Sequence, residues 1–124
     1  MVLCDTNIFI EVYKDNPSII TALKSIGQVN IAISDVTRAE LLYGARNKLE
    51  HKIIKQDLEK LFILPISSAI SAYAVNLIEQ YTLSHNLNLP DALIAATAII
   101  HNIELYTINL KDFRFLTDIS LFNA

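Results

Sequence analysis

Four acidic side chains stand where alternating strands and helices would bring them together. Asp5 follows a short hydrophobic run, Glu40 lies in a later amphipathic segment, and Asp91 opens a strongly apolar one. Asp112 comes shortly after a further hydrophobic run. Convergent carboxylates repel one another, so such a site requires a cation, and all-oxygen ligands suit Mg²⁺ or Mn²⁺. The chemistry that this site favours is metal-assisted phosphodiester hydrolysis, because the ion bridges carboxylate and phosphate.

The elements that must position these residues form an α/β pattern, in which short apolar runs alternate with amphipathic segments. We expect helices at about 8–13, 17–26, 35–43, 48–60, 68–81 and 91–101. The expected strands are 2–4, 31–33, 62–64, 103–107 and a last short edge strand at 119–122. In a mostly parallel sheet the carboxyl ends of the strands share one rim, where ligands bind. The acidic residues should therefore meet at that rim.

The composition favours a single domain covering residues 1–124. The chain is 52% hydrophobic and 19% charged, enough apolar material for a sizeable core. Because Cys4 is the only cysteine, no internal disulfide can form. Its position in a strand predicts a small buried hydrophobic residue. The apolar runs are too short to span a bilayer and we find no targeting segment, so we expect a cytoplasmic protein without membrane contact.

Charge gives little support to nucleic-acid binding, because the formal net charge is −3. One local excess of basic residues comprises Arg46, Lys48, Lys52, Lys55 and Lys60. A solvated helix face is its simpler interpretation, and a track for RNA is the alternative. Arg38 and Arg46 could contact phosphate or a partner protein, and a purely solvent-facing role fits them equally well. The histidines lack paired metal-ligand spacing, so a zinc site is not expected.

Each acidic residue also has a plain structural explanation. Asp5 could cap a helix, and Asp91 would be favourable in a first helical turn through the helix dipole. Glu40 alone would be an exposed helix residue with Arg38 as a surface partner, and Asp112 alone would be a turn residue. The metal-site hypothesis therefore depends on their joint placement.

Four blocks of the sequence, in order, resemble the motifs of the PIN-domain ribonucleases, and in particular the VapC-like toxins of type II toxin–antitoxin systems. They are V-L-C-D-T-N at 2–7, S-D-V-T-R-A-E-L-L-Y-G at 34–44, L-P-D-A-L-I-A-A-T-A at 89–98 and T-I-N-L-K-D-F at 107–113. The resemblance implies a three-layer α/β/α sandwich with a central, mostly parallel sheet. It also implies a Mg²⁺- or Mn²⁺-dependent endoribonuclease that hydrolyses RNA with metal-activated water, a homodimer, and a cognate antitoxin protein.

The resemblance extends to individual residues. The acidic positions, implied to be catalytic and metal-binding, are Asp5, Glu40, Asp91 and Asp112. The supporting polar positions are Thr6, Asn7, Thr107 and Asn109. Asn109 stands where some relatives have an acid, so one ion or two are both open. Candidate residues facing the antitoxin, for which core burial is an equal explanation, are Leu41, Leu42, Ile53 and Ile54.

Two alternatives stay open. A non-catalytic PIN-fold module that binds RNA or protein would use the same fold without cleavage. A haloacid-dehalogenase-like phosphatase also places an Asp after the first strand, but its chemistry requires a second Asp where Asn7 stands. The sequence does not distinguish transfer, ribosomal and messenger RNA as the target.

Overall fold

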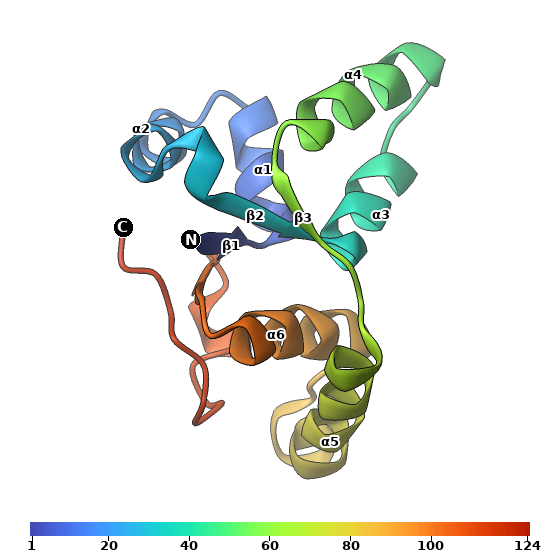
Figure 1. Cartoon of the computed structure of the whole chain (residues 1–124), viewed down its shortest axis with the longest axis vertical. Helices are drawn as coiled ribbons and strands as arrows, with labels where there is room; N and C mark the ends of the chain where they lie inside the picture. Colours follow the sequence, from blue (N-terminus) through green and yellow to red (C-terminus); the bar gives the residue numbers. More distant parts are fainter.

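A computed structural model of the whole chain, residues 1–124, has four parallel strands in a central sheet with helices on both faces (Figure 1). The strands are β1 (Val2–Cys4), β2 (Ile31–Ser34), β3 (Phe62–Leu64) and β4 (Glu104–Tyr106). Their order in the sheet is β3-β2-β1-β4, with every pairing parallel. β1 therefore lies inside the sheet, with Leu3 opposite Ala32 on one side and Leu105 on the other. The predicted three-layer α/β/α sandwich is confirmed.

Helices of the first half of the chain cover one face of the sheet, and those of the second half cover the other (Figure 1). The first set is α1 (Thr6–Tyr13), α2 (Pro17–Ile26), α3 (Asp35–Tyr43) and α4 (Lys48–Glu59). The second set is α5 (Ser68–His85) and α6 (Leu89–His101). Two 3₁₀ turns add η1 (Gln28–Asn30) and η2 (Leu110–Asp112). None of the six helices combines the length and apolarity needed to cross a bilayer.

Each α-helix begins after a polar side chain that accepts a hydrogen bond from a backbone N–H of the first turn, which satisfies an otherwise unpaired donor. These capping residues are Asp5, Asn16, Ser34, Asn47, Ser67 and Asn88. Asp5 directly follows β1 and Ser34 is the last residue of β2, so the first turns of α1 and α3 are fixed at the carboxyl rim of the sheet. That rim is where the acidic residues were expected.

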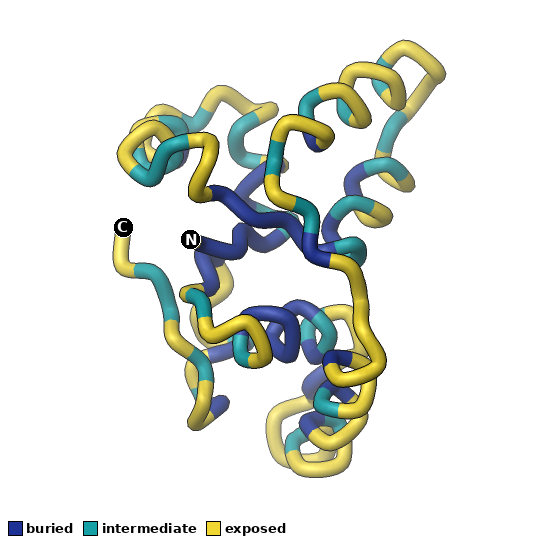
Figure 2. The backbone as a smooth tube through the Cα atoms, in the orientation of Figure 1, coloured by how far each residue is buried: buried dark blue, intermediate teal, exposed yellow.

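Two hydrophobic clusters sandwich the sheet, and β1 contributes to both. Leu3 faces the cluster under α5 and α6, whereas Val2 and Cys4 face the cluster under α1 to α4. A strand buried on both faces is typical of a parallel sheet with helices on each side. α6 is the most deeply buried helix (dark blue in Figure 2), lying between the sheet and α5 as its small apolar residues predict.

The expected edge strand at 119–122 is wrong. The segment makes a single bridge to β4, between Leu105 and Leu121, with Leu105 N donating to the carbonyl of Ser120 at 2.8 Å. Its apolar side chains are instead half-buried by side-chain packing. Ile119 and Leu121 lie against the core, and Phe122 packs on the ring of Tyr106 with centroids 5.0 Å apart. The apolar residues at 119–122 therefore serve side-chain packing, and the segment does not form a hydrogen-bonded strand of the sheet.

Candidate metal centre

Asp5 lies at the carboxyl end of β1, only 5% exposed, with its backbone N–H bonded to the carbonyl of Tyr106. Oδ1 of Asp5 accepts from Thr6 N at 2.8 Å and so caps α1. Oδ2 accepts from Asn7 Nδ2 at 3.1 Å and from Thr107 Oγ1 at 2.9 Å. The carboxylate is thus a cap and the centre of a polar network, so the two interpretations of Asp5 are compatible.

The network ties the start of α1 to the loop after β4. Asn7 Nδ2 lies 3.2 Å from Thr107 Oγ1, and Asn7 Oδ1 accepts from the backbone N–H of Ile108 at 3.2 Å. Asn109 contributes its backbone N–H, which donates to Thr107 Oγ1 at 3.1 Å. The structure thus brings Asn7 and Thr107 onto Asp5 itself, while Asn109 supports the site through its backbone.

Glu40 leans toward the same rim from α3. Its Oε1 accepts a hydrogen bond from Thr6 Oγ1 at 2.6 Å, and the Thr6 hydroxyl also lies 3.0 Å from that of Thr37. Arg38 does not pair with Glu40; it forms an ion pair of 2.7 Å with Asp35, one turn earlier on the same helix. Glu40 is therefore held by Thr6 of α1, the helix that Asp5 caps, and not by a surface arginine.

Asp91 lies in the first turn of α6, where its backbone N–H donates to Oδ1 of Asn88 at 2.9 Å. Burial raises the pKa of Asp91 to about 6, and the negative charges of Asp5, Asp112 and Glu40 add to that effect. α3 and α6 contact each other, which places Glu40 within the electrostatic reach of Asp91. All four predicted acidic residues thus share one region of negative potential.

The pKa of Asp5 is also raised by burial, while hydrogen bonds from Thr107, Thr6 and Asn7 lower it and the charge of Glu40 raises it. The three donors favour the ionised carboxylate against the cost of burial. Cys4, immediately before Asp5, is fully buried, and burial together with the charge of Asp5 raises the pKa of its thiol to about 12. Cys4 is therefore the small buried hydrophobe that its strand position predicted.

Asp112 reaches the region from η2, the turn after β4. Its backbone N–H donates to the carbonyl of Asn109 at 3.0 Å, and the next residue, Phe113, is 1% exposed in the core. Phe113 therefore anchors the turn that carries Asp112. Such an anchor cannot be inferred from turn chemistry alone.

The donor set suits a hydrated divalent ion. No three of the His, Cys, Asp and Glu side chains stand close enough together to surround an ion by themselves. Mg²⁺ commonly keeps several waters and takes one or two carboxylates directly, so it does not need such a cage. Asp5 Oδ1 accepts one hydrogen bond and keeps a lone pair free, whereas Oδ2 already accepts two. Of the two Asp5 oxygens, Oδ1 therefore has the greater remaining capacity to accept, and the Asp91 carboxylate accepts only one long hydrogen bond, from Asn88 Nδ2 at 3.4 Å.

Comparison with known families identifies the fold. The family model described as PIN domain matches residues 2–115. The chain belongs to the PIN-domain family. Among curated relatives, this PIN domain is 36% identical to "Ribonuclease VapC10" of Mycobacterium tuberculosis over 84 residues, which are 67% of the chain. The match spans 62% of that relative's length, less than two thirds of it.

Solved structures resemble this PIN domain over nearly the whole chain. A toxin–antitoxin complex from Klebsiella pneumoniae superposes with a TM-score of 0.82 at 33% identity, covering 96% of this chain and 95% of that one. VapBC2 from Rickettsia felis, bound to a DNA fragment from its promoter, gives a TM-score of 0.82 at 30% identity and covers 100% and 99%. The family resemblance inferred from the four sequence blocks is confirmed.

A groove of about 670 Å³ between α1, α3 and α4 opens next to the acidic residues of the PIN domain, with Glu40 among its lining residues. Leu41 is 6% exposed and belongs to the core, although it also contributes to the lining of the groove, and Leu42 is half-buried outside the lining. Ile53 is 45% exposed, and both Ile53 and Ile54 line the groove. The sequence pointed to some of these residues but not to the groove itself, because α1 closes one side of it and is separated from α3 and α4 by α2 and β2.

Proposed function

We propose that this PIN domain, a single domain over residues 1–124, is a divalent-metal-dependent endoribonuclease and the toxin of a toxin–antitoxin pair. The observation that carries the proposal is the gathering of Asp5, Glu40, Asp91 and Asp112 from four separate elements. Burial raises the pKa of Asp91 to about 6, and the charges of the other three carboxylates add to that rise. Mutual repulsion of this kind is typical of functional sites that await a cation. The relative named as a ribonuclease supports the same activity.

In this proposal Asp5 and Asp91 hold the principal ion, directly or through water, while Glu40 and Asp112 complete the acidic shell. Mg²⁺ and Mn²⁺ both suit the all-oxygen donor set. A bound ion of this kind lowers the pKa of a coordinated water and offsets the charge of the scissile phosphate. Without that positive charge, the four carboxylates would repel an RNA phosphate.

The chain's own residues prepare the site. Thr6, Asn7 and Thr107 donate to Asp5 and favour its ionised form, which is the form able to bind a metal. The hydroxyl of Thr6 also orients Glu40. The thiol of Cys4 is buried and its pKa is raised to about 12, so it does not supply a nucleophile. In this proposal the nucleophile is water, and the family resemblance implies 5′-phosphate and 3′-hydroxyl products.

Cleavage of RNA by the purified protein tests the proposal. We expect cleavage with Mg²⁺ or Mn²⁺, loss with EDTA, recovery on adding excess metal, and no detectable cleavage by Asp91→Asn. Asp118→Asn is the matched control, because Asp118 is exposed and contacts Tyr73 instead of the acidic region. Parental cleavage by Asp91→Asn, or cleavage unaffected by chelation, would refute the proposal.

The rival functions have less support. A non-catalytic module would bind metal or RNA in titrations and leave RNA intact, so the cleavage assay separates it from the nuclease. Membership in the PIN-domain family leaves the phosphatase alternative without support. In addition, Asn7 donates its amide to Asp5, a role that a second acid could not fill when ionised.

The proposed partner is an antitoxin that occupies the groove between α1, α3 and α4. Exposed Ile10 and Ile53 give the groove an apolar lining, and Glu40 adds a negative charge to it, whereas the charge of Glu50 is offset by its ion pair with Arg46. We therefore expect the partner segment to carry apolar side chains and a cationic group. Co-expression with the neighbouring reading frame should relieve growth arrest, and Ile53→Asp should weaken the complex. Unchanged arrest in the presence of that frame's product would contradict this assignment.

A homodimer, implied by the resemblance, stays a prediction that light scattering on the purified protein can test. A monomer at all concentrations would contradict it.

A further inference from the structure

Arg46 lies between the groove and a second, open hollow at the start of α4. It lines the groove together with Glu40, and it also lines the hollow, of about 360 Å³. Lys48 and His51 line this second hollow as well, and no acidic residue does. A surface that lacks acidic groups therefore begins where the groove beside the acidic site ends.

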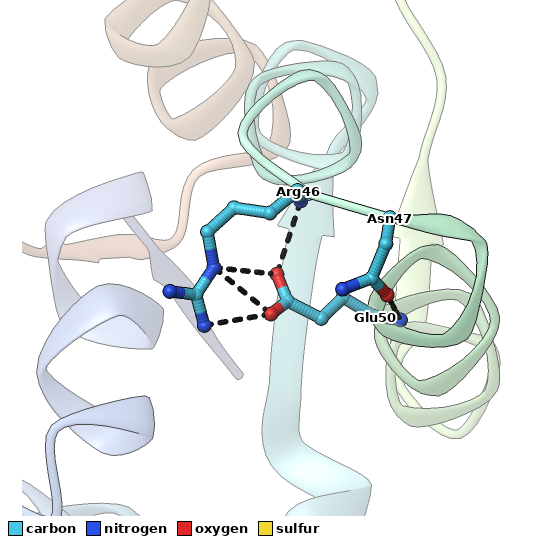
Figure 3. A network of polar contacts seen from close by, with 3 residues as sticks. All are labelled: Arg46, Asn47 and Glu50. Atoms are coloured by element: carbon cyan, nitrogen blue, oxygen red, sulfur yellow. Dashed lines mark hydrogen bonds and ion pairs between the residues drawn. The ribbon is translucent and has the colours of Figure 1, made fainter.

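Glu50 fixes the orientation of the Arg46 side chain. Arg46 Nε donates to both carboxylate oxygens at 3.2 and 3.0 Å, and Nη2 donates to Oε2 at 2.7 Å (Figure 3). Glu50 also accepts from the backbone N–H of Arg46, and its own N–H donates to the Asn47 cap. The ion pair is thus braced by backbone contacts at both residues.

This pairing leaves half of the guanidinium free. A guanidinium has five N–H donors, and Glu50 takes only the edge formed by Nε and Nη2. Nη1 has no partner, and Figure 3 shows it directed away from Glu50. The side chain of Arg46 is 84% exposed. The free edge of Nη1 and Nη2 has the spacing that binds two oxygens of one phosphate.

The remaining charges of α4 favour an anion on the same side of the molecule. Of its three acidic residues, Glu50 is paired with Arg46, Asp57 accepts a hydrogen bond from the Tyr13 hydroxyl at 2.8 Å, and Glu59 lies exposed at the opposite end of the helix from Arg46. Lysines recur at helical spacing along the exposed surface of α4, at Lys48, Lys52 and Lys55. The chain as a whole has a net charge of −3, so a local cationic surface is needed for RNA to approach it.

We propose that Arg46, with Lys48 beside it, binds backbone phosphates of a single-stranded RNA next to the phosphate that is cleaved. Glu50 is then a positioning residue that presents the guanidinium. This inference rests on the proposed ribonuclease function, since the strand that reaches the acidic residues would continue along the groove to Arg46. It deepens that function by assigning the part of the surface that holds the flanking backbone.

Binding without cleavage tests the inference separately from catalysis. In an Asp91→Asn background, a fluorescein-labelled single-stranded RNA of mixed sequence is titrated by anisotropy at NaCl concentrations from about 50 to about 200 mM. Adding Arg46→Ala should weaken binding about fivefold, the factor for one exposed ionic contact. It should also reduce the slope of log affinity against log salt by about 0.7, the value for one phosphate on a single strand.

Arg38→Ala is the matched control, because Arg38 also sits in a single ion pair within one turn but lines neither hollow. It should change neither affinity nor slope, and Arg46→Lys should keep the slope while binding more weakly than arginine. An Arg46→Ala protein with parental affinity and slope overturns this inference alone. Weaker antitoxin binding with unchanged RNA binding also overturns it, in favour of a protein contact. Absence of metal-dependent RNA cleavage by the parent protein, measured in parallel, overturns the ribonuclease proposal on which this inference rests.

Discussion

Asp91→Asn should stabilise the metal-free protein at neutral pH, although Asp91 is a proposed metal ligand. Burial and the charges of Asp5, Asp112 and Glu40 raise its pKa from 3.8 to about 6. An acid whose pKa is higher in the folded than in the unfolded chain stabilises the fold only while it is protonated. The native protein therefore loses stability as the pH rises from 3.8 through about 6. Asparagine has nearly the same shape and avoids that loss.

The magnitude follows from two opposing effects. The rise in the pKa of Asp91 from 3.8 to about 6 corresponds to about 3 kcal/mol at most. Asp91 is only half-buried, and screening by solvent reduces this to about 1–2 kcal/mol. Removing the charge also gives up its attraction to the α6 N-terminus, worth about 0.3–1 kcal/mol. The net gain should be about 1 kcal/mol above about pH 7, or roughly 4 °C in Tm.

Urea unfolding in EDTA at a series of pH values measures this effect. The stability difference between Asp91→Asn and the parent should be near zero at about pH 4 and grow until about pH 7. Asp118→Asn, outside the acidic region, should show no such trend. A variant less stable than the parent at neutral pH, or a gain that does not depend on pH, would refute the account of repulsion at this site.

Three further predictions concern the same region. In thermal melts, Mg²⁺ added at about 100 times its Kd should stabilise the parent by about 2.7 kcal/mol and should not stabilise Asp91→Asn. Equal shifts of Tm in both proteins would exclude Asp91 as a ligand. Thr107→Val removes a donor that lowers the pKa of Asp5, so the acid limb of the pH–rate profile should move to higher pH. Thr107→Ser should return the acid limb to its parental position. An acid limb that does not move in Thr107→Val would show that Thr107 does not lower the pKa of Asp5. Phe113→Ala should cost about 3–5 kcal/mol in urea unfolding because the ring is 1% exposed; a loss below about 1 kcal/mol would mean that the site collapses without a cavity.

The sequence was sufficient to predict the elements that short-range chemistry defines. Ser34 stands before an amphipathic segment and begins a helix there, as the side chain of a good capping residue should. The end of α5 is different, because apolar periodicity stops near Tyr81 while the helix continues to His85. There His85 stacks on Phe115, 4.1 Å between ring centroids, and this contact joins residues that sequence periodicity cannot relate.

In the candidate site, too, some contacts follow from the local sequence and others depend on long-range packing. That Arg38 cannot pair with Glu40 follows from helix geometry alone, because residues two apart point to different sides of a helix. The partner that Glu40 does have, Thr6, is 34 positions away, and only the packing of α1 on α3 brings it there. Strand order and helix packing decide such long-range pairs, and a single sequence carries no local signal for them.

The buried thiol of Cys4 provides a built-in chemical probe of local unfolding around β1. Cys4 is the sole cysteine, it is fully enclosed, and its pKa of about 12 leaves almost no thiolate at neutral pH. An alkylating reagent can therefore react only when β1 separates from its neighbours. The labelling rate would then report how often the inner strand comes apart, a fluctuation that neither a melting curve nor an activity measurement resolves.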